Sequence, residues 1–394
     1  MIIAILFWGS IFLILYAYLG YPALVWFFAR FKSQDFSEEK YEPSVTLLIA
    51  AYNESAAIAK KIENSLALDY PREKFQILIT NDGSDDGTDK IVRSYANRGV
   101  EMVSGAARQG KMIAIKRGIK AARGEIIIMS DATNAYSLNT IKALVAPFAD
   151  SSVGLTSGAK FVPKGDGVLG SSEGLYWKYE SWIKKEETKL GCCINVTGEI
   201  YAVRKFLFGA PPDGIINDDF YMMMNVIKQG YRVIYTPNAQ SWERVSKTAT
   251  DEIERRARIN AGRYQAMAMA KDYLPYDRPL VIWQIVSHKF IRPLIPFGMI
   301  LAFIANFLTF FFPAPPNATF WLLAEPWNRF FFSAQMLFYA SALLGNYFKG
   351  GRFSKILYIP TFLVNSNWAA LKGFFRFANR RQTTLWQRVQ RREE

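Results

Sequence analysis

Three acidic segments of this sequence each follow a short apolar run, and they contain the residues best suited to chemistry. Glu54 comes after VTLLIAA, Asp82 after FQILIT, and Asp131 after EIIIMS. One acidic residue after a strand usually marks a turn or a helix cap, which is the expected role of Asp85 and Asp86. Three carboxylates at one edge of a sheet would instead form a polar site that suits a nucleoside or a metal ion.

The segment ARQGK, residues 107–111, opens a predicted helix between the second and third acidic segments. Backbone amides at the start of a helix and the helix dipole favour an anion, and Lys111 adds a positive charge. The pattern therefore indicates phosphate binding, although the G-x-x-x-x-G-K spacing of a Walker loop is absent.

Histidine and cysteine are scarce, which limits the possible mechanisms. His288 is the only histidine among 394 residues, and the only cysteines, Cys192 and Cys193, are adjacent. Serine–histidine hydrolysis and multi-histidine metal sites are therefore excluded, and acid–base chemistry must use carboxylates. Adjacent cysteines do not pair without strain, so the pattern fits a reducing compartment.

A sheet must position the acidic segments. Val45–Ala51, Phe75–Thr80 and Glu125–Ser130 are short apolar runs with β-branched residues, and helical patterns lie between them. Over residues 43 to 245 this alternation predicts an α/β fold with a mostly parallel, buried sheet. Ligands bind beyond the carboxyl ends of the strands in such sheets, where the acidic segments lie.

The composition predicts a water-soluble domain with membrane segments attached. Hydrophobic residues make up 51% of the chain and aromatic residues 15%, yet 21% of the residues are charged. The formal net charge of +14 suits anionic partners such as lipid head groups, nucleic acid or phosphorylated substrates.

The membrane segments are expected at both ends of the chain. The apolar stretch from Ile2 to Ala29 is long enough to cross a bilayer, and the basic residues after it predict a cytosolic location for the domain on its C-terminal side. It is too long for a signal peptide and lacks a basic n-region. Further spans are expected at 294–312 and 330–347. Polar residues interrupt the run 356–375, so we expect it to dip into the bilayer or lie along its surface.

An ordered set of motifs runs from about Val45 to Gln265: AYNE, NDGSDDGT, RQGK, SDATNAY, YWKYE, TGEIYAVRK, IINDDF, KQGYRVIYTPNA and RRARINAGRYQ. This set resembles the family 2 glycosyltransferases, which are inverting, nucleotide-sugar-dependent enzymes with the Rossmann-like GT-A fold. With its flanking membrane segments, the chain is similar to the branch that includes cellulose, hyaluronan and poly-N-acetylglucosamine synthases. The resemblance implies a membrane hexosyltransferase of polysaccharide biosynthesis that uses a UDP-sugar donor.

The resemblance implies a donor-binding set. Tyr52, Glu54 and Asp82 would hold the uracil and ribose, and Asp131 is the first acid of the DxD motif. Thr133 occupies the position of the second acid, so Asp131 and Thr133 would bind Mg²⁺ or Mn²⁺ more weakly than two carboxylates do. The full set of expected donor-binding residues is Ala51, Tyr52, Glu54, Asp82, Lys111, Asp131, Arg255 and Arg258.

The resemblance also implies a catalytic base and an acceptor site. Asp219 matches the general base of the family, eleven residues before Gly230, and Asp218 fills the preceding acidic position. The Asp219 carboxylate would deprotonate the acceptor hydroxyl, whose oxygen then attacks the anomeric carbon. Arg258 matches the arginine that grips the pyrophosphate. The expected acceptor-binding residues are Gly198, Glu199 and Ile259, the last of which replaces a tryptophan that stacks on sugar in polymer synthases.

Other functions remain as alternatives. Transfer to a polyprenyl phosphate, as in dolichol-phosphate mannose synthases, shares the fold, although that branch generally lacks the RRAR-like segment. A glycoside hydrolase also uses paired carboxylates but needs no nucleotide site. A membrane scaffold would leave Asp131, Asp219 and Arg258 without a common purpose. A nucleic-acid partner is not expected, because it would explain the charge but not the membrane segments.

We therefore expect a multi-pass protein of the plasma (inner) membrane whose catalytic domain faces the cytosol. Its partners would be a nucleotide-sugar, a saccharide or glycolipid acceptor, and membrane lipids. The expected organisation is an N-terminal transmembrane helix (1–30), a cytosolic GT-A domain (31–245), basic and interfacial helices (246–292), a C-terminal membrane region (293–375) and a basic cytosolic tail (376–394).

Overall fold

The computed structural model describes residues 1–31, 41–163, 167–246, 248–315, 317–348 and 351–382. It contains two compact units. The helical unit comprises Met1–Leu24, Thr248–Ala268 and Trp283–Gln382, and the sheet unit comprises Val25–Lys247 and Met269–Ile282. Residues 383–394 of the predicted basic tail lie outside the described residues.

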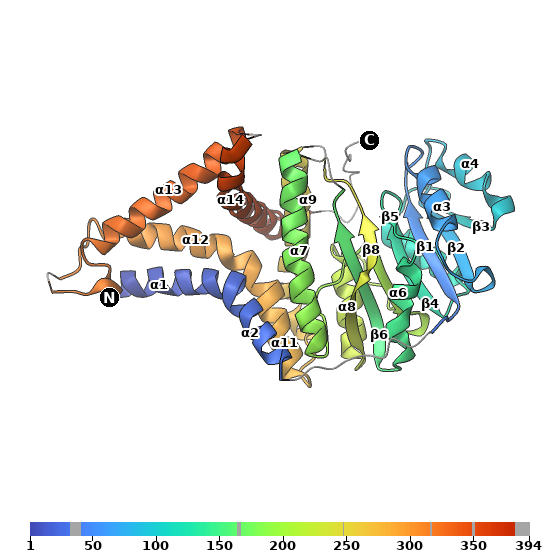
Figure 1. Cartoon of the computed structure of the whole chain (residues 1–394), viewed down its shortest axis with the longest axis horizontal. Helices are drawn as coiled ribbons and strands as arrows, with labels where there is room; N and C mark the ends of the chain where they lie inside the picture. Colours follow the sequence, from blue (N-terminus) through green and yellow to red (C-terminus); the bar gives the residue numbers. More distant parts are fainter. Residues whose placement is uncertain (32–40, 164–166, 247, 316, 349–350, 383–394) are drawn as a thin grey trace. The chain divides into compact units, whose positions relative to one another are not determined.

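An eight-stranded mixed sheet with the order β3-β2-β1-β4-β7-β6-β8-β5 forms the centre of the sheet unit (Figure 1). β1 is flanked by β2 and β4 in parallel, while β7 runs antiparallel to both β4 and β6. The three apolar runs predicted from the sequence are β1, β2 and β4. The strands are β1 (Val45–Ala51), β2 (Phe75–Asn81), β3 (Val100–Ser104), β4 (Ile126–Asp131), β5 (Ala135–Tyr136), β6 (Val153–Phe161), β7 (Ile200–Arg204) and β8 (Arg232–Trp242).

Helices cover both faces of this sheet, which explains why its central strands are apolar on both faces. One face packs against α3 (Ile58–Leu66), α4 (Thr88–Arg93) and α6 (Thr140–Val145), whose apolar residues share a buried core with alternate residues of the strands. The other face packs against α5 (Lys111–Ala121), α7 (Gly167–Lys189) and α8 (Asp218–Lys228). On that face Gly118 of α5 lies against Leu48 of β1.

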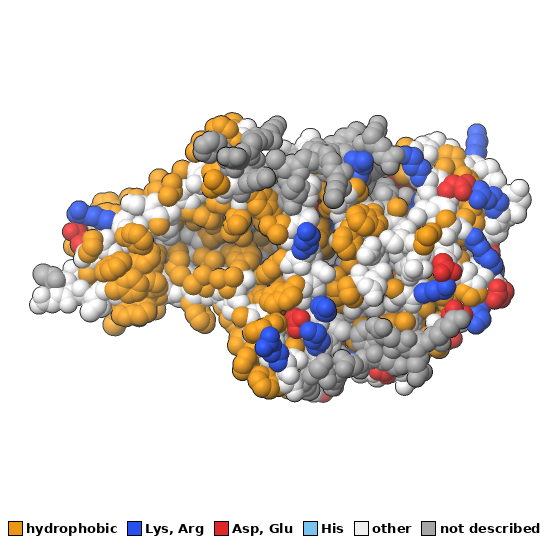
Figure 2. All heavy atoms as spheres, viewed as in Figure 1, with side chains coloured by type: hydrophobic (Ala, Val, Ile, Leu, Met, Phe, Trp, Pro, Cys, Tyr) orange, Lys and Arg blue, Asp and Glu red, His pale blue; other side chains and the backbone are white. Residues whose placement is uncertain are grey.

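Most of two long apolar helical stretches belongs to the helical unit. Among the described residues, two helical stretches are long and apolar enough to cross a membrane by length and composition, Ile2–Ala29 and Pro279–Leu308. Large apolar side chains on them point outward, for example Phe12 and Phe307, and Figure 2 shows hydrophobic side chains gathered over these helices. The stretches comprise α1 (Ile2–Leu15), a π-helical turn (Tyr16–Gly20) and α2 (Tyr21–Ala29), then α11 (Pro279–Ile285), a second π-helical turn (Val286–Phe290) and α12 (Ile291–Leu308).

The polar residues that interrupt the run 356–375 contact neighbouring helices of the same unit. This run lies in α14 (Gly351–Ala378), and α13 (Trp327–Tyr347) precedes it. Asn365 donates a hydrogen bond to Asn346 (2.9 Å), and Asn367 donates one to the hydroxyl of Tyr18 (3.1 Å). These partners satisfy the amides that made the run unsuitable as a lipid-facing span. Whether this segment dips or spans stays a prediction.

The last third of α14 packs against α9 (Ala249–Ala268), which carries the RRAR-like segment. Lys372 donates to Glu254 at 2.5 Å, and Arg376 donates to the same carboxylate. Gly373 lies so close that an added Cβ would stand 2.7 Å from the Ala257 carbonyl oxygen. The two helices therefore meet backbone to backbone, and the ion pairs hold the pair in register.

Candidate functional site

Strand register brings the acidic segments to one rim of the sheet. Ala51 pairs with Asn81, and Ala50 pairs with Asp131, so β1, β2 and β4 end side by side. β7 runs in the opposite direction, with Ile200 next to Ser130. Glu199, which immediately precedes β7, therefore starts at the rim where β4 ends.

Two more strands end at this rim. β6 and β8 run parallel, and Phe161 at the end of β6 pairs with Trp242 at the end of β8. Lys160 and Glu243 therefore lie at the same edge as Glu199. We call the part formed by Tyr52, Glu54, Asp82, Lys111 and Asp131 the β1–β4 side, and the part formed by Lys160, Glu199, Ser241 and Glu243 the β6–β8 side.

Asp82 is held at the start of α5. Its carboxylate accepts hydrogen bonds from the backbone N–H groups of Gln109 (3.0 Å) and Gly110 (2.7 Å). The amides that the sequence suggested for phosphate are thus engaged by this aspartate, because the start of a helix attracts any nearby anion. Gly83, with a φ of +71°, permits this approach, since a Cβ there would stand 2.5 Å from the Ala107 carbonyl carbon.

The loop after β1 places Tyr52 beside an arginine. The guanidinium carbon of Arg108 lies 4.2 Å from the centroid of the Tyr52 ring, within the range of a cation–π contact. The backbone N–H of Glu54 donates to the Thr88 hydroxyl at 2.9 Å. Asp86 accepts hydrogen bonds from the Ser55 and Thr88 amides, which is the turn and cap role expected for it.

Lys111 lies between the acids of two elements. Its ammonium group donates to Asp131 at 2.8 Å. Burial acts to lower the pKa of Lys111, but the charges of Asp131, Asp218 and Asp219 outweigh it and raise the pKa above its ordinary value. The predicted donor-side acid and the predicted base thus act on one cation.

Asp219 lies in the first turn of α8, against the backbone of the TGE segment. A Cβ added to Gly198 would stand 3.1 Å from the Asp219 Oδ2 atom. The other carboxylate oxygen accepts the N–H of Phe220 at 2.8 Å. The structure therefore brings together Gly198 and Asp219, with Glu199 next in the chain, and it places Asp218 in the same helical turn.

The position of the second DxD acid is linked to a buried carboxylate. The Thr133 hydroxyl donates to Glu243 at 2.9 Å. Lys160 donates to both Glu243 and Glu199, and all three side chains of this bridge are at most 8% exposed. Burial raises the pKa of Glu199, and the Glu243 carboxylate adds to the effect, while Lys160 opposes it.

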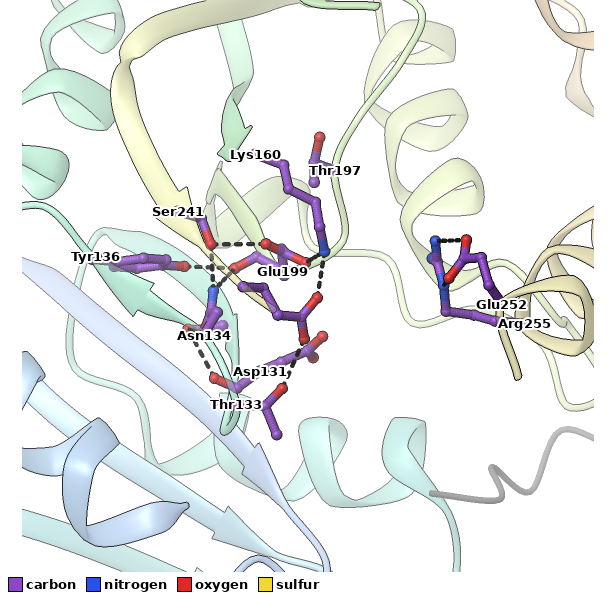
Figure 3. A network of polar contacts seen from close by, with 12 residues as sticks. Asp131, Thr133, Asn134, Tyr136, Lys160, Thr197, Glu199, Ser241, Glu252 and Arg255 are labelled. Atoms are coloured by element: carbon purple, nitrogen blue, oxygen red, sulfur yellow. Dashed lines mark hydrogen bonds and ion pairs between the residues drawn. The ribbon is translucent and has the colours of Figure 1, made fainter. Parts of the chain in front are cut away.

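The Glu199 segment is held from several directions, as Figure 3 shows. Ser241 donates to the Glu199 carboxylate at 2.8 Å. The Glu199 carbonyl oxygen accepts from the Asn134 amide (2.9 Å) and from the Tyr136 hydroxyl (2.7 Å). Residues from the loop after β4, from β5 and from β8 thereby fix one glutamate.

A buried lysine supports this network from α3. Lys61 donates to the side-chain oxygen of Asn134 at 2.9 Å, and its ammonium nitrogen lies 4.1 Å from the centroid of the Tyr136 ring. Burial lowers the pKa of Lys61 to about 7, although Asp131, Glu199 and Glu243 act in the opposite direction.

The β1–β4 side fits a metal ion that uses few protein ligands. Among the described residues no group of three or more His, Cys, Asp or Glu side chains could hold a metal ion. Mg²⁺ is commonly bound through one or two carboxylates together with substrate phosphates. Asp131 can supply such a carboxylate, whereas the Thr133 hydroxyl is bonded to Glu243.

Three predicted site residues belong to the helical unit. Arg255, Arg258 and Ile259 lie on α9, and their substrate roles stay predictions. Arg255 donates to Glu252 at 2.6 and 3.0 Å, and Arg256 donates to the same glutamate at 2.8 Å. Burial acts to raise the pKa of Glu252, but these two arginines outweigh it and lower the pKa.

Several residues of the network were not found from the sequence. Glu243 follows a strand, as the acidic residues predicted for the site do, so its position in the sequence could have indicated that it belongs to the site. Lys61 occupies the buried stripe of α3 together with Ile58, Ile62 and Ser65. A lysine on such a stripe needs a buried partner, and this also could have marked it. Lys160 had no comparable signal.

Comparison with known proteins identifies the class. Residues 46–206 match the family described as Glycosyl transferase family 2. Together with the sheet and its rim of acids, this match shows that the chain contains a family 2 glycosyltransferase domain, and the prediction of a glycosyltransferase is confirmed.

Particular relatives agree with this class. The poly-beta-1,6-N-acetyl-D-glucosamine synthase of Staphylococcus aureus (strain COL) is 27% identical over 242 residues, which are 60% of this chain and 58% of the relative. The Staphylococcus epidermidis enzyme of the same name is 24% identical over 245 residues, 61% of this chain and 58% of the relative. The match thus spans less than two thirds of these relatives.

A solved structure covers more of the chain. The mannosyltransferase from Pyrobaculum calidifontis, solved in complex with GDP-Man and Mn²⁺, superposes with a TM-score of 0.68 at 22% identity and covers 93% of this chain and 99% of its own. This likeness concerns the fold, and it confirms the GT-A-like α/β architecture predicted from the sequence.

Proposed function

We propose that this protein transfers a sugar from a nucleotide-sugar donor to a hydroxyl group of a saccharide or glycolipid, with inversion at the anomeric carbon. The observation that carries the proposal is the position of Lys111, which is bonded to Asp131 and is also within the electrostatic reach of Asp218 and Asp219. A donor-side acid is therefore paired with a cation on which the candidate base also acts electrostatically.

Asp219 serves as the general base in this proposal. Its carboxylate accepts the proton of the acceptor hydroxyl as the oxygen attacks the anomeric carbon, and the bond from that carbon to the diphosphate breaks. The absence of a side chain at Gly198 leaves the Asp219 carboxylate close to the backbone, next to Glu199. Gly198 and Glu199 then line the space for the acceptor.

The β1–β4 side holds the nucleotide. Tyr52, Glu54 and Asp82 contact the nucleoside, and Lys111 provides positive charge for the diphosphate that leaves. Asp131 holds a Mg²⁺ or Mn²⁺ ion, which supplies further charge neutralisation for the diphosphate when it is bound. We expect a UDP-sugar, as the motif resemblance implies, and the poly-N-acetylglucosamine synthases at 27% identity support a hexosamine among the candidates.

The helical unit anchors the enzyme in a membrane. The stretches Ile2–Ala29 and Pro279–Leu308 are the candidate spans. Arg30 follows the first of them, and basic residues on one side of a span favour the cytosol. The proposed enzyme is therefore a multi-pass protein of the plasma membrane with a cytosolic sheet unit.

A donor panel tests the proposal. The purified full chain is incubated in detergent or in lipid nanodiscs with UDP-N-acetylglucosamine, UDP-glucose, UDP-galactose or GDP-mannose, and release of the nucleoside diphosphate is measured. We expect release with one UDP-sugar, and further stimulation by an added oligosaccharide or glycolipid acceptor. No release with any donor, in the presence of Mg²⁺ or Mn²⁺, would contradict the proposal.

A further inference from the structure

A buried glutamate stands where the loop after β4 lacks its second acid. The Thr133 hydroxyl donates to the Glu243 carboxylate at 2.9 Å. Glu243 follows β8 directly, 110 residues further along the chain, and is 3% exposed. A carboxylate is absent at position 133 but is present within hydrogen-bonding distance of it, in the segment that follows β8.

An ionised acid at position 133 would be unfavourable beside this glutamate. Two carboxylates that share one site do not both ionise readily, since like charges at short range repel strongly. A hydroxyl group donates a hydrogen bond to the carboxylate, which an ionised aspartate does not. Thr133 and Glu243 are therefore complementary, because the Thr133 hydroxyl donates a hydrogen bond to the buried Glu243 carboxylate.

Glu243 also connects the two sides of the rim. Lys160 forms ion pairs with both Glu243 and Glu199, and its side chain is 8% exposed. The chain of contacts runs from Thr133, next to the Asp131 loop, through Glu243 and Lys160 to Glu199. Figure 3 shows the Lys160 and Glu199 side chains facing each other near the Asp131–Thr133 loop.

We propose that Glu243 is a positioning residue that joins the β1–β4 side to the β6–β8 side. It fixes the Asp131 loop through Thr133, and it fixes Glu199 through Lys160. This inference rests on the proposed function, because it concerns the relative placement of the donor and acceptor groups. Glu243 itself needs no contact with either substrate.

The proposal is tested by two substitutions that together move the carboxylate from position 243 to position 133. Thr133→Asp alone adds a carboxylate beside Glu243. The double variant Thr133→Asp with Glu243→Gln keeps the net charge and restores a hydrogen bond, now from the glutamine amide to the aspartate. Glu101→Gln is the control, because it removes an ion-paired carboxylate (with Arg123) on β3, at the far edge of the sheet. Each variant is compared for apparent melting temperature, kcat and donor KM.

Thr133→Asp should lower the melting temperature and reduce kcat by about 10- to 100-fold, the usual range for a group that orients a functional residue. The donor KM should change less, because the Asp82 and Tyr52 region is untouched. The double variant should recover most of both losses.

Three outcomes would overturn the proposal. Thr133→Asp could be as stable and active as the wild type, or the double variant could be no better than Thr133→Asp. Recovery of the melting temperature without recovery of kcat would show that the hydrogen bond between positions 133 and 243 stabilises the fold but does not position the site. If the wild type turns over no donor, the proposed function fails, while the melting comparison still tests the Thr133–Glu243 pair.

Discussion

The two sides of the rim hold their acids by different means. On the β1–β4 side, Asp82 is held by two backbone amides at the start of α5, and Asp131 is paired with Lys111 from the same helix. On the β6–β8 side, Glu199 and Glu243 share the charge of Lys160, and three segments distant in sequence supply these residues. The first side is built from neighbouring motifs, and the second from tertiary pairing.

This difference has an energetic consequence. An acid held by backbone amides keeps its partners whatever happens to one side chain, because the helix start persists. A buried carboxylate that depends on one lysine becomes an uncompensated charge when the lysine is lost. We therefore expect substitutions on the β1–β4 side to act mainly on donor binding and the reaction, and substitutions on the β6–β8 side to act on stability as well.

The largest effect is expected at Asp219, which lies against Gly198 and acts electrostatically on Lys111. Asp219→Asn should reduce kcat by about 10²- to 10⁴-fold, because the amide cannot accept the acceptor proton. Binding of the nucleoside diphosphate, measured by calorimetry, should persist. Asp213→Asn is the control, since that aspartate is exposed and makes only a long ion pair, 3.9 Å, with Lys116. Near-normal turnover by Asp219→Asn would show that Asp219 is not the general base.

The second prediction concerns the metal ion at the β1–β4 side. A chelator should reduce turnover by about 100-fold or more, comparable to the loss of one strong electrostatic group. Millimolar Mg²⁺ or Mn²⁺ should restore it, because Asp131 offers a single carboxylate and the ion is expected to bind weakly. Asp131→Asn should not be restored by the same concentrations. Full activity in the chelator would show that Lys111 and other cations suffice for the diphosphate.

The same contrast explains how much the sequence could predict. β1 was predicted at its observed bounds, Val45–Ala51, and β2 and β4 to within a residue at each end. Glu54, Asp82 and Asp131 lie at or just beyond the carboxyl ends of those strands, so their meeting at one rim followed from parallel pairing. Lys160 and Glu243 meet only because Phe161 pairs with Trp242. The position of this strand pair relative to β4 depends on the antiparallel β7, which lies between β4 and β6 and which no local pattern specified.

The third prediction is a pH dependence at Lys61, the buried lysine of α3 that contacts Asn134 and Tyr136. The pKa of Lys61 is about 7 in the folded protein and near 10.5 in the unfolded chain. Between these values the unfolded chain binds one more proton, so this group's stabilising contribution is present at high pH and is lost as the pH falls towards 7. The full slope is about 1.4 kcal/mol per pH unit.

Melting curves between pH 7 and pH 8.5 measure this slope. The wild type should melt at a higher temperature as the pH rises, relative to Lys61→Met, in which the titrating group is absent. Lys60→Met is the matched control, because Lys60 precedes it on the same helix and is exposed. Parallel pH profiles for the wild type and Lys61→Met would contradict a depressed lysine pKa.

The smallest effect is expected at Gly198, where the base meets the acceptor segment. A Cβ at this position would stand 3.1 Å from Asp219 Oδ2 and 3.5 Å from the Asp219 Cγ atom. The carboxylate can yield by a few tenths of an ångström, so Gly198→Ala should fold normally and melt near the wild-type temperature. Its kcat should fall by roughly several-fold, because a shift of about 1 Å in a reacting group can cost 10²-fold and this shift is smaller. Gly174→Ala on α7 is the control, since no atom lies within 4 Å of its added Cβ. A loss confined to the donor KM would place Gly198 nearer the nucleotide than the base. Unchanged kcat and KM would show that the observed approach of Asp219 to Gly198 is not the arrangement used in transfer.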